Sequence, residues 1–342
     1  MAAATDGGRA VRYLRGMAPV RSPIRSPIRS PVPCSLAALA TLTACGGAGA
    51  GASDAAPDDG GADASAAYGD PLVGIGAVSL VRGGYQFVEG PQWRDAEGDL
   101  LFSDIPASTI YRYAPGGAAP TVFRMPSNNS NGLALDPAGA VLAAEHGTRA
   151  VSRAGVAIAT MFEGKRLNSP NDVIAAADGT IYFSDPPYGI PAGQQQELAF
   201  NGVFRLTPAG QMFADYRTAP TSRPNGVGLS PDGKTLYVDD TADGKLYQVP
   251  VGDAGALGAR GVLATTSGNP DGLAIDLGGN VFVATATGVE VFSPAGARWG
   301  VIAVPEQPAN CAFGDADHQS LYITARTGLY RVRLAHPGLP RR

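Results

Sequence analysis

The chain has 342 residues, of which 44% are hydrophobic and only 16% are charged, with 46 glycines and 28 prolines. A typical soluble domain carries about 25% charged residues, so this composition favours a turn-rich β protein over a helical one. The formal net charge of −4 gives no electrostatic reason to expect nucleic acid as a partner. No apolar run reaches the roughly 18 residues of a transmembrane helix, so none is expected.

Residues 1–45 have the composition of an export signal. Arginines recur before a short apolar run, CSLAALATLTA, which ends at Cys45. A positive region followed by an apolar region and small residues is typical of secretory signals. The string LTAC resembles a bacterial lipobox, which implies a lipidated Cys45 that anchors an exported protein to a membrane facing the periplasm or the outside. Plain secretion and an ordinary Cys45 in a disordered leader are the alternatives. The arginine-rich region is long for such a signal, so Met17 is a second candidate for the translation start.

Residues 46–70 include GGAGAGASDAAPDDGGADASAA, which has too little apolar surface to form a core. This segment is expected to be a flexible linker between the export signal and the folded part. The folded domain is expected over residues 71–335, followed by a short C-terminal tail at 336–342.

Six copies of one pattern occupy the predicted domain. Each opens with Glu, Asn or Asp, continues as an apolar run, and reaches a turn eight or nine residues later, before a second apolar run. The turn residue is glycine in five copies and His318 in the sixth. A recurrence of about 40 to 54 residues with several strands per copy is typical of β-propeller blades. The sequence therefore predicts an all-β, six-bladed β-propeller, with a six-hairpin sandwich as the alternative.

The opening residues of the six copies are termed the anchor ring: Glu89, Asn131, Asn171, Asn225, Asp271 and Asn310. In a propeller the innermost strand of each blade follows the central channel, so the anchors should converge at one channel mouth. Carboxylate and amide oxygens suit a hard divalent cation, and without one the two carboxylates would repel each other. The alternative is that each asparagine only caps its strand or forms an Asx turn.

Several strings carry a family resemblance: EGPQW, RLNSPNDV, YFSDPPYG, RPNGVGLSPDG and NPDGLAID. In this order they resemble the senescence marker protein, gluconolactonase and regucalcin-like family of six-bladed propellers, over Gly84 to Arg331. The resemblance implies a lactonase that acts on a small sugar-acid lactone with a bound divalent metal, most readily Ca²⁺, with Zn²⁺ or Mg²⁺ also possible. The implied metal ligands are Glu89, Asn225 and Asp271, and Asn171 matches a further pocket asparagine that can also ligate.

The chemistry implied by the resemblance needs no protein nucleophile, and the chain has no G-x-S-x-G elbow. Asp271 is the implied general base, although it is also an implied ligand. Asn131, Asn171 and His146 are predicted to contact substrate, with a purely structural His146 as the alternative. Cys311 is expected to point off the channel into the core.

Two other functions fit a propeller with such a ring. One is a non-catalytic module that binds a ligand or partner at the channel mouth, and the other is a related hydrolase of esters or phosphoesters. Two carboxylates among the amides favour the metal-dependent enzyme, because a pure interaction module has no need of them.

Overall fold

The computed structural model describes residues 69–117 and 119–339, which lie in the compact unit Asp59–Arg342. Cys45 and residues 46–68 of the predicted linker lie outside the described residues. No helix in the described part of the chain is long and apolar enough to cross a membrane.

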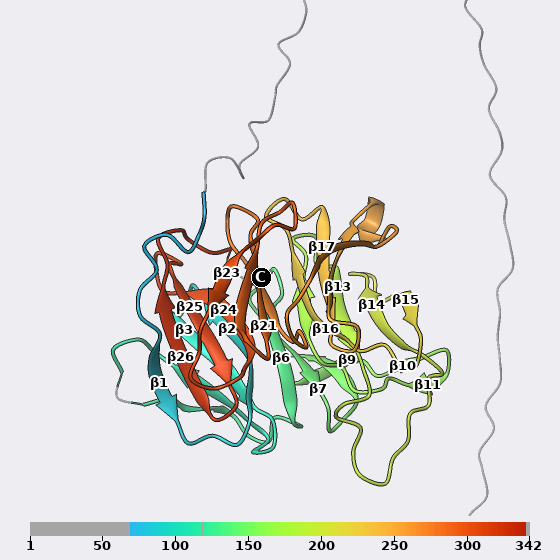
Figure 1. The fold of residues 1–342 in the computed structure, drawn as a ribbon. Helices are drawn as coiled ribbons and strands as arrows, with labels where there is room; N and C mark the ends of the chain where they lie inside the picture. The colour runs from blue at the N-terminus through green and yellow to red at the C-terminus, as the bar shows by residue number, and fades with distance from the viewer. Residues whose placement is uncertain (1–68, 118, 340–342) are drawn as a thin grey trace, which may run out of the picture. The chain divides into compact units, whose positions relative to one another are not determined.

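Six four-stranded antiparallel sheets form the six blades, as the sequence predicts (Figure 1). Blade 1 contains β2 (Val88–Arg94), β3 (Asp99–Asp104), β4 (Thr109–Tyr113) and β5 (Thr121–Arg124). Blade 2 contains β6 (Ser130–Leu135), β7 (Val141–Glu145), β8 (Ala150–Arg153) and β9 (Val156–Ala159). Blade 3 contains β12 (Val173–Ala175), β13 (Ile181–Asp185), β14 (Asn201–Leu206) and β15 (Met212–Thr218).

The remaining three blades repeat this order from the inner strand outward. Blade 4 contains β16 (Pro224–Leu229), β17 (Thr235–Asp240), β18 (Lys245–Pro250) and β19 (Gly261–Thr265). Blade 5 contains β20 (Leu273–Ile275), β21 (Val281–Thr285), β22 (Gly288–Phe292) and β23 (Arg298–Ile302). Blade 6 contains β24 (Pro308–Gly314), β25 (Ser320–Ala325), β26 (Gly328–Arg333) and β1 (Ser79–Gly83). A short hairpin of β10 (Met161–Phe162) and β11 (Lys165–Arg166) and a 3₁₀ turn, η2 (Asp253–Gly255), complete the elements of the described residues.

The turns between the first two strands of each blade lie at the predicted glycines and, in the sixth blade, at His318. Gly98, Gly139 and Gly233 have φ values of 63°, 81° and 69°, in the left-handed region that glycine enters without steric cost. His318 takes the same place in the sixth turn with φ 53°, so the irregular sixth copy keeps the shared turn geometry. Its Nε2 lies 2.6 Å from Asp95 Oδ1 in the corresponding turn of blade 1.

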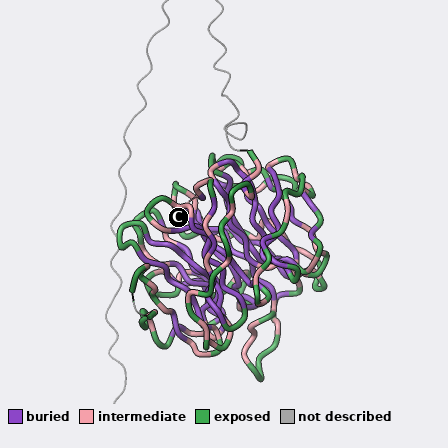
Figure 2. The backbone as a smooth tube through the Cα atoms, turned by 60° about the vertical axis from the view of Figure 1, so that its left-hand side comes forward, coloured by how far each residue is buried: buried purple, intermediate pink, exposed green. Residues whose placement is uncertain are grey.

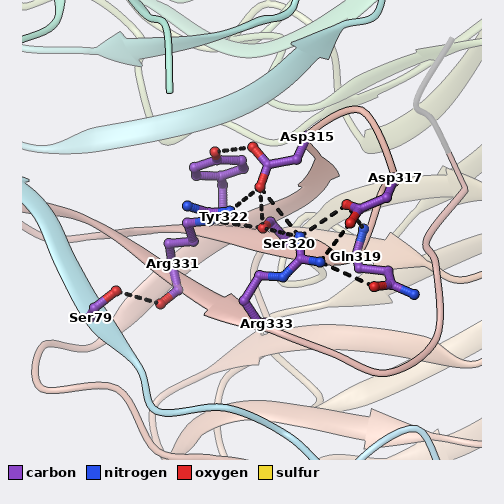
Figure 3. Close-up of polar contacts among 8 residues, drawn as sticks. All are labelled: Ser79, Asp315, Asp317, Gln319, Ser320, Tyr322, Arg331 and Arg333. Atoms are coloured by element: carbon purple, nitrogen blue, oxygen red, sulfur yellow. Dashed lines mark hydrogen bonds and ion pairs between the residues drawn. The ribbon is translucent and has the colours of Figure 1, made fainter. Parts of the chain in front are cut away.

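The ring of blades closes through blade 6, whose outermost strand comes from the start of the domain. β1 pairs antiparallel with β26 (Figure 1). A polar cluster on the same blade surrounds Asp315, which accepts hydrogen bonds from Ser320 Oγ, Tyr322 Oη and the Arg331 guanidinium (Figure 3). The Tyr322 ring stacks parallel to Trp93 of blade 1 at a centroid distance of 6.0 Å. First and last blades are thus joined by backbone pairing and by side-chain packing.

The inner and middle strands are buried and the outer strands are largely exposed (Figure 2). Cys311, on β24, is fully buried in the core that also contains Phe282 and Phe313, which confirms the prediction that it points away from the channel. Beyond residue 335 the chain remains bound to the propeller, because Gly338 N donates to His318 O and Leu339 N to Ile275 O. Residues 336–339 are therefore a docked segment.

Candidate active site

The anchors lie at the starts of the six inner strands. Glu89, Asn131, Asn225 and Asn310 are within the first three residues of β2, β6, β16 and β24, and the other two lie two residues before the starts of β12 and β20. Five of them are buried, with exposed fractions of 2 to 5%, whereas Asp271 is partly exposed. Asp271 is therefore the anchor most open to solvent and to a ligand.

Small residues after the anchors allow neighbouring blades to approach closely. Gly132 N donates to Asn171 O (2.8 Å) and Gly226 N to Asp271 O (3.0 Å). A Cβ added to Gly272 would lie 1.9 Å from Asn310 Cγ, and one added to Gly90 would lie 2.2 Å from Asn131 O. After four of the six anchors a glycine thus leaves room for the next blade, which brings each of these anchors close to its neighbour at one mouth.

Aspartates at the ends of three second strands hold the segments that lead into the anchors. Asp104 accepts from the backbone N–H groups of Gln86 and Phe87, at 3.0 and 3.1 Å. Asp185 accepts from those of Asn168 and Ser169, both at 2.7 Å. In blade 4, Asp240 accepts from Arg223 N at 2.8 Å. Each aspartate thus accepts hydrogen bonds from the backbone two or three residues before an anchor, and these bonds fix the direction in which the anchor side chain points.

Burial and mutual repulsion disfavour ionisation of the two ring carboxyl groups. Burial raises the pKa of Glu89, and the Asp271 charge raises it further, against a hydrogen bond from Gly90 N (2.8 Å). Burial likewise raises the pKa of Asp271, and a hydrogen bond from Asn225 lowers it. The Oδ1 atom of Asn225 is buried and has no hydrogen-bond partner among the described residues. Two destabilised carboxylates beside an orphaned amide oxygen fit an oxygen-ligated cation.

Two further carboxyl groups, which the sequence did not predict, lie at the ring. Asp172 Oδ2 accepts from Val227 N at 3.1 Å, and Asp239 Oδ1 accepts from Gly226 N at 3.2 Å. Asp239 is fully buried, and burial followed by the Asp271 charge raises its pKa. The available signal was that Asp172 stands where four other copies have glycine, and Asp239 where the others have serine, alanine or threonine.

Further polar side chains contact the anchors at the mouth of the channel. The His146 and Asn131 side chains meet with Nε2 and Nδ2 3.4 Å apart, and Asn225 Nδ2 donates to Thr241 Oγ1 at 3.0 Å. Burial lowers the pKa of His146 to about 4, so this imidazole is neutral at physiological pH. In the adjoining loop, Gly189 packs against the His146 ring, and its neighbour Tyr188 is half-exposed.

The structure thus gathers the predicted site residues Glu89, Asn131, Asn171, Asn225, Asp271 and His146 at one end of the inner strands. Within the described ranges, no three His, Cys, Asp or Glu side chains form a ready metal-binding group. Any cation at the ring would therefore depend on amide oxygens as well as carboxylates. A cavity of about 310 Å³ lies at the opposite ends of these strands, beside Ala176, Ser230 and Leu339.

The fold and the anchor ring define a six-bladed β-propeller with an oxygen-rich site at one mouth of its channel. Residues 87–327 match the family model described as SMP-30/Gluconolactonase/LRE-like region. The chain belongs to this family, and the resemblance seen in its motifs is confirmed.

Individual relatives match most of the domain. A gluconolactonase from Zymomonas mobilis is 35% identical over 291 residues, which cover 75% of this chain and 81% of the relative. A pentonolactonase from Haloferax volcanii is 28% identical over 258 residues, covering 70% of this chain and 81% of the relative. The solved structure of a Xanthomonas campestris gluconolactonase has a TM-score of 0.71 and 34% identity, over 78% of this chain and 91% of that one.

Proposed function

We propose that the protein is a metal-dependent lactonase that hydrolyses a sugar-acid lactone to the open-chain acid. The observation that carries this proposal is the anchor ring, in which the buried carboxyl group of Glu89, the partly exposed one of Asp271 and the orphaned amide oxygen of Asn225 lie at one mouth. The two bacterial gluconolactonases and the archaeal pentonolactonase support lactones of sugar acids as the substrate class.

Glu89, Asn171, Asn225 and Asp271 would hold the cation. Ca²⁺ suits an oxygen-only set of carboxylates and amides best, since it accepts six to eight oxygens in loose geometry, while Mg²⁺ and Zn²⁺ are the alternatives. A structure of similar fold, a regucalcin from Agrobacterium tumefaciens with 19% identity and a TM-score of 0.64, is described as a calcium-binding protein. When bound, such a cation supplies a Lewis acid for the lactone carbonyl.

The chain's own side chains have distinct tasks in this proposal. Asp271 takes the proton of the attacking water, because it is the anchor that is partly exposed at the mouth. Asn131 and Asn171 hydrogen-bond the substrate. The neutral imidazole of His146 offers one further hydrogen bond, and its contact with Asn131 orients both side chains. Water then adds to the acyl carbon, the bond between that carbon and the ring oxygen breaks, and the ring oxygen leaves as a hydroxyl group by taking the proton held by Asp271.

The test is hydrolysis of D-glucono-1,5-lactone by residues 71–342, followed as acid release. Activity is expected to disappear with a chelator and to return with added Ca²⁺, Zn²⁺ or Mg²⁺, the most effective ion identifying the preferred metal. Activity that survives complete removal of metal would refute metal dependence. Absence of hydrolysis with every ion would favour a non-catalytic binding module.

We also propose that the protein is exported and held at a membrane through lipidated Cys45. The lipobox-like LTAC string and the linker composition of residues 46–70 support this proposal.

A further inference from the structure

One position is repeated around the channel mouth directly after the second strand of each blade. We call it the rim position, and its residues are Ile105, His146, Pro186, Thr241, Ala286 and Arg326. In blades 2 and 4 the rim side chain contacts the anchor of its own blade, His146 beside Asn131 and Thr241 beside Asn225. The same position in blade 6 carries Arg326, and the anchor of that blade is Asn310.

The Arg326 side chain is held between the segments that lead into two anchors. Its Cζ lies 5.5 Å from the ring centroid of Phe87, two residues before Glu89. Its Nη2 donates at 2.6 Å to Oε1 of Gln307, three residues before Asn310. The guanidinium is thereby placed at the mouth between blades 1 and 6, and its charge also lowers the pKa of Asp271 in blade 5.

The backbone conformation and hydrogen bonds of Arg326 fix its position at the mouth. Arg326 has φ 44°, a conformation that costs free energy for a residue with a side chain. Its carbonyl accepts from Val88 N at 2.9 Å, and Thr327 O accepts from Tyr85 N at 3.1 Å. These bonds tie the turn to blade 1, so the site of Arg326 is fixed at the junction that closes the propeller.

The donor chemistry of Arg326 differs from that of its surroundings. A guanidinium has five N–H donors in a planar fork and no acceptor, whereas the ring carboxylates below it are acceptors only. One of the five donors is engaged by Gln307. A second arginine, Arg223, lies before β16, and its Nη1 donates to the carbonyls of Pro220 and Ser222. Arg326 is therefore better suited than Arg223 to bind a ligand.

We propose that Arg326 is a specificity-determining residue that donates hydrogen bonds to hydroxyl oxygens of a polyhydroxylated lactone seated over the anchor ring. This rests on the proposed lactonase function and names a residue that would select its hydroxylated substrate. Hydroxyl oxygens are ready acceptors for the free N–H groups, and the ring amides and carboxylates below can serve the same hydroxyls as donors and acceptors. A lactone without hydroxyl groups gains nothing from Arg326.

The test compares D-glucono-1,5-lactone with δ-valerolactone, which has the same ring and no hydroxyl groups. Arg326→Gln keeps much of the length of the side chain and removes the charged fork. It should raise KM for the sugar lactone roughly tenfold, change kcat much less, and leave kcat/KM for δ-valerolactone close to wild type. For the sugar lactone, the KM of Arg326→Lys should lie between those of the wild type and Arg326→Gln.

The matched control is Arg112→Gln, on β4, an exposed arginine whose nearest acidic partner is Asp99 at 3.8 Å; it should match wild type on both lactones. Equal losses on both lactones in Arg326→Gln would show that Arg326 acts by tuning Asp271, and would overturn the inference. Unchanged kinetics would overturn it too. Both outcomes leave the proposed lactonase intact, whereas a wild-type protein inactive on both lactones would refute the proposed function.

Discussion

At the scale of single residues, the anchors depend on side chains that do not themselves belong to the ring. Asp104, Asp185 and Asp240 each accept backbone N–H groups just before an anchor. These hydrogen bonds hold the entering backbone in one conformation, so each anchor side chain starts from a fixed Cα–Cβ direction. Asp185 is the most buried of the three, with no exposed surface, and its charge is the most costly to maintain.

The titration of Asp185 should appear in the pH dependence of stability. Burial raises its pKa from 3.8 to about 7, although hydrogen bonds from Asn168 and Ser169 lower it. Between about pH 4 and pH 7 the folded protein retains a proton that the unfolded chain has lost. The contribution of this carboxyl to the free energy of unfolding therefore falls as pH rises through that window, and is constant above it.

Asp185→Asn should remove this dependence. Relative to wild type, the variant should gain roughly 3 kcal/mol in free energy of unfolding between pH 4.5 and pH 8, measured by urea unfolding at a series of pH values. Exposed Glu97→Gln is the control, and its profile should run parallel to wild type. A parallel profile for Asp185→Asn would mean that Asp185 does not titrate in this window.

At the scale of elements, the ring is assembled by glycines between inner strands. Gly272 is the tightest case, since any Cβ there overlaps Asn310, which is itself buried. A hydrogen bond from Asn310 also helps to lower the pKa of Glu89. The contact between blades 5 and 6 is therefore linked to the charge state of the ring through a single side chain.

Gly272→Ala is predicted to harm both packing and activity. The added methyl group must displace Asn310 or separate the two blades, which should cost roughly 1–3 kcal/mol of stability and reduce lactone turnover. Urea unfolding and kcat/KM measure the two effects. Gly252→Ala is the matched control, because its Cβ would have no contact closer than 3.5 Å. A Gly272→Ala protein with wild-type stability and turnover would contradict the proposed packing role.

The anchors could be predicted because each inner strand carries its polar residue and turn at nearly constant spacing. Asp172 was not recognised, although it stands where four other copies have glycine, because the sixth copy also departs from glycine, with Cys311, and one departure from a repeat is weak evidence. Asp239 could not be inferred in the same way. Its carboxylate reaches the ring from the second strand through the space left by Gly226, where a Cβ would lie 2.7 Å from Asp239 Oδ2. That path depends on the packing between strands.

At the scale of the whole molecule, six blades were predictable from six copies, but the way the ring closes was not. The outer strands share no sequence signature, so the repeats do not show that β1, from the start of the domain, completes blade 6. This closure is physically important because it pairs the edge of β26 and joins the two ends of the domain.

Membrane anchoring is a prediction about the complete chain. Replacing Cys45 by serine should move the protein from the membrane fraction to the soluble fraction of the exporting cell, because a serine cannot accept the thioether-linked lipid. Immunoblotting of the two fractions measures the shift, and the wild-type chain provides the control. Continued membrane retention of Cys45→Ser would contradict lipidation at this residue.

We propose that the anchor ring binds a divalent cation and uses it to hydrolyse a lactone. Glu89→Gln tests it most directly, because the substitution keeps the shape of a buried ligand and removes its charge. Hydrolysis of D-glucono-1,5-lactone and calorimetric Ca²⁺ binding are measured on the same preparations of wild type, Glu89→Gln and the exposed control Glu97→Gln. Glu89→Gln is expected to remain folded while losing at least about a hundredfold in turnover, with weakened Ca²⁺ binding. Wild-type turnover and wild-type Ca²⁺ affinity in Glu89→Gln would contradict it.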